Sequence, residues 1–77
     1  MPRYFFYLVR KGVVIPDDEG TELSDVDEAH REAVLTARDL IIRILRTDEP
    51  FPPHDSVHVI DERGSKVLAV TLKEALG

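Results

Sequence analysis

The sequence predicts an α+β fold, ordered β-β-α-β-β, in which one long helix covers one face of a four-stranded, mainly antiparallel sheet. The first observation is residues 3–10, where four consecutive aromatic side chains and the branched chains after them are typical of a strand. The second is residues 25–46, which hold no glycine or proline and repeat apolar side chains at helical spacing. The third is a pair of segments rich in β-branched residues, 56–61 and 66–72, separated by a short turn that contains glycine.

The first two strands form a predicted hairpin. The polar break from Arg10 to Gly12 suits a tight turn, and residues 13–15 form a short second strand. That strand ends at Pro16, which cannot donate a hydrogen bond to a sheet, so we expect it at an edge. A right-handed connection from the second strand to the third favours the spatial order 2-1-3-4, with the aromatic strand inside.

The helix has a stripe of apolar side chains that should face the sheet. Ser24 is the expected N-cap, because a serine side chain accepts hydrogen bonds from the first turn and acidic residues follow it. At 100° per residue, the stripe spans an arc of about 160°. Its members are Val26, Ala29, Ala33, Val34, Ala37, Leu40, Ile41, Ile44 and Leu45.

Leu35 and Ile42 lie outside that stripe, on the opposite side of the helix among charged residues. Single exposed apolar residues are common and need no explanation. A second interpretation is that the proline-rich linker folds back and places Phe51 over Ile42. A third is that Leu35 and Ile42 form a contact between subunits.

Length and composition limit the class of protein. A chain of 77 residues predicts one domain, residues 1–77, whose small core needs support. Cysteine is absent, which excludes disulfides, fits a reducing cytosol and leaves oligomerisation as the simplest support. The formal net charge of −5 argues against nucleic-acid binding, and no segment has the length of a membrane span. We therefore expect an acidic, cytoplasmic protein.

The sheet has no clearly polar face. Alternation along the first strand turns three side chains toward the helix and turns Phe5, Tyr7 and Val9 away from it. His58 and Ile60 of the third strand face the same way as this second set. Since one helix covers only one face, leaving Phe5, Tyr7, Val9 and Ile60 in water is unfavourable. A homodimer through the back of the sheet is the leading prediction, and Leu35 with Ile42 is the competing site.

Residue patterns that carry chemistry are weak in this sequence. An acidic loop is more readily a solvated turn than a calcium site, because it lacks the spacing of an EF-hand; its carboxylates are Asp17, Asp18, Glu19 and Glu22. The three histidines lack the spacing of a zinc site, and no glycine-rich phosphate loop or cysteine nucleophile occurs. We expect no enzymatic activity, no metal and no cofactor.

The opening MPRYFFYL, the segment IPDDEGTEL and the alanine-rich helix resemble a family of small uncharacterised bacterial proteins. Members of this domain-of-unknown-function family typically begin MPRYFFH and continue to an acidic-Gly-x-Glu-Leu segment. The resemblance covers nearly the whole chain and implies the fold without an activity. Tyr7 stands where the family usually has histidine, so no role of that histidine transfers.

A looser similarity is to the partial-RNase-H-like antitoxins, which place an acidic segment containing glycine before an A-x-x-x-A helix. Those proteins have a third strand before the helix, and this sequence gives no pattern for one. The leading function is therefore a non-enzymatic association module acting as a homodimer, of unknown process. The alternative is an antitoxin-like or regulatory protein that binds a heterologous protein partner, and a metal-binding or enzymatic role comes third.

Overall fold

Five strands and two helices make up the computed structural model, which describes all 77 residues. In chain order they are β1 (Arg3–Arg10), β2 (Val13–Ile15), β3 (Thr21–Glu22), α1 (Val26–Arg46), β4 (Ser56–Ile60), β5 (Lys66–Thr71) and α2 (Leu72–Ala75). The fold is α+β, as the sequence predicts. No helix combines the length and the apolar character needed to cross a bilayer.

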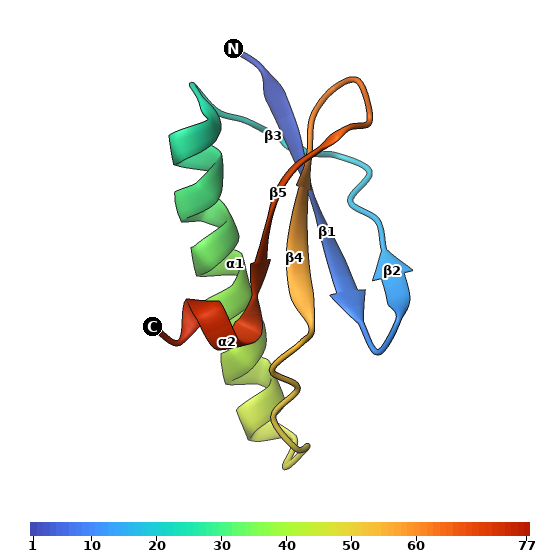
Figure 1. The fold of residues 1–77 in the computed structure, drawn as a ribbon, viewed down its shortest axis with the longest axis vertical. Coiled ribbons are helices and arrows are strands. Elements are labelled where there is room, and N and C mark those ends of the chain that lie inside the picture. Colours follow the sequence, from blue (N-terminus) through green and yellow to red (C-terminus); the bar gives the residue numbers. More distant parts are fainter.

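The sheet is antiparallel throughout and has the order β2-β1-β4-β5 (Figure 1). The four expected strands therefore lie in the expected spatial order, with the aromatic strand inside. The expected number of strands is wrong, because β3 adds a fifth that pairs with β1. A third strand, β3, therefore does precede the helix. Its two residues are too few to show a period-2 pattern in the sequence.

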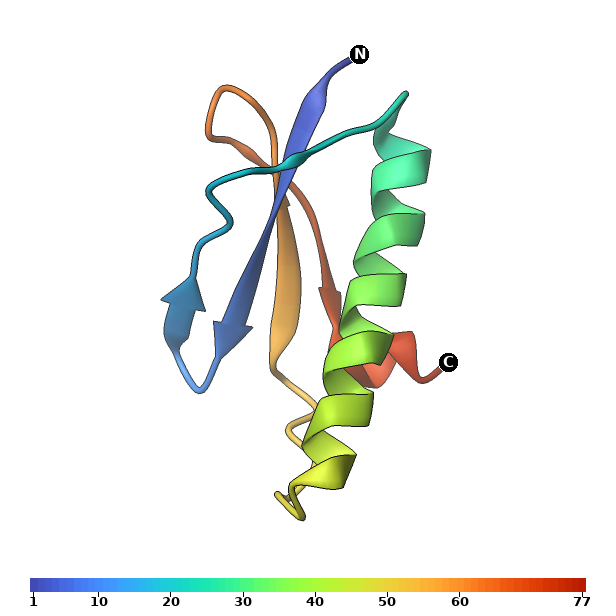
Figure 2. The same cartoon turned by 180° about the vertical axis from the view of Figure 1, so that it is seen from behind.

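Both helices lie on one side of the sheet (Figures 1 and 2). The N-cap of α1 is Asp25 rather than Ser24: the Asp25 carboxylate accepts a hydrogen bond of 2.8 Å from the Glu28 amide. Ser24 instead donates its hydroxyl to the Glu28 carboxylate at 2.8 Å. The helix therefore begins one residue later than expected.

The core lies between α1 and the middle of the sheet. Three alanines of the helix stripe are completely buried, and so are Val57 and Val59 of β4. Val26 and Leu45, expected in the core, are 43% and 65% exposed. In Figure 1 the C-terminal turns of α1 extend past the ends of the strands, which leaves Leu45 uncovered. Val26, at the start of the helix, lines a hollow together with Tyr4 and Val67 and is only partly covered.

Alternation breaks once in β5. Val59 pairs with Leu68 but Ile60 pairs with Lys66, so Val67 is an extra residue in β5. Strict alternation would place Val67 on the opposite face, whereas here both Val67 and Leu68 pack against the core. After β5 the chain turns into α2, where Thr71 and Glu74 form a capping box. The chain there packs back onto α1, because Arg38 donates a hydrogen bond of 3.0 Å to the carbonyl of Ala75.

Candidate association surfaces

The back of the sheet, defined here as the face turned away from both helices, carries the five predicted interface residues of β1 and β4. Phe5 pairs with Ile60 and Tyr7 pairs with His58, so their side chains stand in adjacent rows. Val9 continues the β1 row. All five are half-buried, and no helix covers them (Figures 1 and 2).

His58 occupies the centre of this face. Tyr7 lies beside it on β1 and the exposed Ala69 lies beside it on β5. Burial lowers the pKa of His58, and the ammonium group of Lys66 lowers it further. The imidazole is therefore held toward its neutral form.

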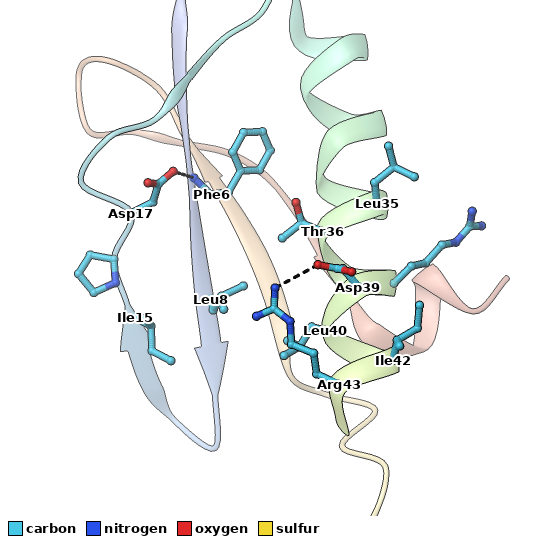
Figure 3. Close-up of a pocket in the computed structure, with 12 residues that line it drawn as sticks. Phe6, Leu8, Ile15, Asp17, Leu35, Thr36, Asp39, Leu40, Ile42 and Arg43 are labelled. Atoms are coloured by element: carbon cyan, nitrogen blue, oxygen red, sulfur yellow. Dashed lines mark hydrogen bonds and ion pairs between the residues drawn. The ribbon is translucent and has the colours of Figure 1, made fainter. Parts of the chain in front are cut away.

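The helix side of β1 and β2 is also incompletely covered. A groove of about 790 Å³ lies between these strands and α1, because the helix packs mainly over β4 and β5. Phe6, Leu8 and Ile15 extend from the sheet into this groove, and Leu40 faces them from the helix (Figure 3). The helix wall also carries an ion pair of 3.1 Å between Asp39 and Arg43.

Leu35 and Ile42 stand at the outer rim of that groove and point away from the sheet (Figure 3). They are 56% and 48% exposed. Phe51 packs against the buried core, and Ile42 keeps its exposure. The structure thus leaves two separate apolar surfaces uncovered, one on each side of the sheet.

Comparison with known families shows which family this chain belongs to. The model of the family described as "Domain of unknown function (DUF6894)" matches residues 3–73. The chain belongs to the DUF6894 family. Neither the curated proteins nor the solved structures gave a match. Family membership accordingly leaves the function of this DUF6894 domain unknown.

The acidic loop of this DUF6894 domain is tied to the sheet by Asp17. One carboxylate oxygen accepts the Phe6 amide of β1 at 3.2 Å, and the other accepts the amides of Glu19 and Gly20, each at 3.2 Å. Phe6 lies on the edge of β1 between the residues paired with β2 and those paired with β3. Asp17 therefore fills the gap between two short strands, which is a structural role.

The other three carboxylates of the loop do not converge with Asp17. Glu22 forms an ion pair of 3.0 Å with Arg3, whose guanidinium also donates to the Glu19 carbonyl at 2.9 Å. Asp18 is exposed. Nowhere in the chain do three or more His, Cys, Asp or Glu side chains gather as a metal site requires.

Gly20 is the point where this loop crosses the back of the sheet. Its φ is +71°, and a Cβ built there would lie 2.8 Å from a ring carbon of Phe5. Only glycine combines this backbone conformation with this close approach. The loop thereby covers part of the Phe5 ring.

Asp55 is a buried polar residue that the sequence analysis did not single out. Its carboxylate accepts a hydrogen bond of 3.1 Å from the Arg10 guanidinium and another of 3.1 Å from the Lys11 amide. Its backbone carbonyl accepts the Leu72 amide at 2.8 Å. Asp55 thus joins the first hairpin turn, the linker and the start of α2. Its partners are 44 and 45 residues away, so no local pattern in the sequence indicates this role.

Proposed function

We propose that this DUF6894 domain is a non-enzymatic association module that forms a homodimer through the back of its sheet. The observation that supports the proposal is the absence of any helix over this face, although it carries two aromatic rings and two branched chains in adjacent rows. Antiparallel sheets that face water normally have polar side chains on that face. A second copy would cover these side chains as one sheet packs on another.

The size of the face predicts a weak dimer. The 24 strand residues, at about 3.3 Å along a strand and about 4.8 Å between strands, give a plan area of roughly 380 Å². Stable interfaces bury at least about 600 Å² per partner, so the plan area of the sheet falls below that range and predicts a weak contact. We expect a dissociation constant on the order of micromolar.

Sedimentation velocity over a range of concentrations tests the proposal. Ala69 is already exposed beside His58, so Ala69→Arg places a charge on the back of the sheet without disturbing the core. We expect the wild type to dimerise and Ala69→Arg to bind itself at least about tenfold more weakly, because two unpaired charges would be buried.

Leu35→Arg is the matched control, since it places the same side chain on the helix surface that competes with the sheet. It should leave the dimer unchanged. A wild type that remains monomeric at all concentrations overturns the proposal. So does a dimer that Leu35→Arg disrupts and Ala69→Arg leaves intact, because that result assigns the contact to Leu35 and Ile42.

A heterologous protein partner is the second candidate, and the groove between α1 and the first two strands favours it. Its apolar floor remains open when the back of the sheet is covered, because it lies on the other side. Ile15 is 46% exposed in that floor. A partner that binds the wild type and is lost with Ile15→Glu, while the self-association is retained, would support this candidate.

A further inference from the structure

His58 lies where any partner on the back of the sheet would meet it. β4 is an inner strand, with β1 on one side and β5 on the other. Tyr7 and Ala69 are the direct cross-strand neighbours of His58, and Ser56 and Ile60 flank it along β4. A sheet packed on this face therefore removes water from the imidazole.

The titratable groups around His58 include no counter-ion for a protonated imidazole. From β1 the nearest is the phenol of Tyr7, and from β5 it is the ammonium group of Lys66, which repels a second positive charge. The carboxylate of Glu22 at the far end of the face is already paired with Arg3. Asp18 and Glu19 belong to the loop that crosses this face at Gly20, and both are exposed. We therefore consider a packing that keeps this loop of the second copy away from His58, so that no free carboxylate reaches the imidazole.

We infer that His58 makes the homodimer sensitive to pH, so that the two copies separate when the imidazoles take up protons. This inference rests on the proposed dimer through the back of the sheet. A neutral imidazole packs against Tyr7 and Ile60 at little cost, whereas a buried imidazolium without a partner is unfavourable. The dimer thus binds fewer protons than two monomers, and association weakens as the pH falls below the pKa of His58 in the monomer.

The direction of this effect separates it from general behaviour near the isoelectric point. The isoelectric point of the sequence is about 5.0, so acidification brings the net charge of −5 toward zero. Loss of net charge promotes association. Dissociation on acidification therefore has the opposite sign to the change that net charge alone produces.

The test is the dissociation constant of the full chain by sedimentation at about pH 7.5 and about pH 5.5, on either side of the usual range of histidine. A histidine whose pKa is one unit lower in the dimer than in the monomer weakens affinity by at most about tenfold, and that limit is reached only below both pKa values. Between these two pH values we therefore expect a loss of several-fold for each histidine, and about tenfold or more for the two together. His58→Gln should dimerise at both pH values with similar affinity. His54→Gln is the matched control, since His54 is exposed outside the strands, and it should behave as the wild type.

The outcomes distinguish this inference from the proposal beneath it. A wild type that is monomeric at both pH values defeats the proposed dimer. A dimer with the same affinity at both pH values, or one whose pH dependence persists in His58→Gln, defeats the role of His58 and leaves the dimer standing. Circular dichroism of each variant at both pH values establishes that the compared chains are folded.

Discussion

Replacing Asp17 with alanine tests whether the acidic loop serves the fold. The substitution removes the acceptor for three backbone amides, those of Phe6, Glu19 and Gly20. A net contribution of about 1 kcal/mol per hydrogen bond gives about 3 kcal/mol. Glu19 is exposed and Gly20 lies in the loop, so water can replace part of their loss, which lowers our expectation to about 2 kcal/mol.

Thermal unfolding followed by circular dichroism measures this change. For a domain of this size, about 2 kcal/mol corresponds to a fall in Tm of roughly 8–16 °C. Asp18→Ala is the control, because Asp18 is the exposed neighbour with the same charge, and it should change stability by less than about 0.5 kcal/mol. Asp17→Asn should fall between the two, since one amide oxygen still accepts from the loop and the amide nitrogen cannot accept from Phe6.

Hydrogen exchange then identifies which bond is lost. The Phe6 amide should lose protection in Asp17→Ala while the amides of β4 keep theirs until global unfolding. Equal Tm values for Asp17→Ala and Asp18→Ala would refute the structural role of Asp17. A rise in the Tm of the wild type with added calcium would refute it as well, because it would assign the carboxylate to a cation.

Three further substitutions, the first with its own control substitution, test other contacts by urea unfolding and by NMR. Gly20→Ala should lower the free energy of unfolding by about 2 kcal/mol or more. Gly64→Ala is its control, because Gly64 also has a positive φ, +85°, but no atom lies within 4 Å of the added Cβ, and it should cost about 1 kcal/mol. Equal losses in the two variants would contradict the close packing at Gly20. Asp55→Ala should cost about 2–3 kcal/mol because it leaves a guanidinium and an amide without their buried acceptor, and a loss below 1 kcal/mol would contradict that account. The backbone and hydroxyl hydrogen bonds of Thr71 lower the pKa of Glu74, so this carboxylate supports the fold above its unfolded pKa and the support is lost as pH falls through the lowered value. Thr71→Ala keeps the backbone donor and removes the hydroxyl, so the pKa of Glu74 followed by NMR titration should rise part of the way, and an unchanged pKa would contradict the contribution of the hydroxyl.

The parts of the fold that follow from local patterns could be predicted from the sequence. Alternation along β1 places Tyr4 in the core and Tyr7 on the back of the sheet, because the strand repeats every two residues. Helical periodicity likewise identifies the buried alanines and the outward Leu35. These assignments depend only on neighbours in the chain.

Apart from the N-cap of α1, which is Asp25 and not Ser24, the parts that failed depend on distant partners. In the sequence Asp17 is one of several acidic residues in its loop. Its structural role comes from accepting the amide of Phe6, which lies 11 residues earlier. Asp55 depends on a turn 44 residues away, and the pairing of β3 depends on the exact position of β1. The groove follows from where α1 packs across the sheet, which the length and stripe of the helix do not determine.

The position of β1 in the sheet has a consequence for synthesis of the chain. β1 leaves the ribosome before its principal partner β4, which begins only at Ser56. At about 5–20 residues per second, the run from Tyr4 to Tyr7 waits on the order of 3–10 s with only the short β2 and β3 to pair with. During that interval an unpaired aromatic strand is exposed to other nascent chains. Rapid local closure of the first hairpin, and of the loop that Asp17 ties to its edge, would shield this strand until the rest of the sheet arrives.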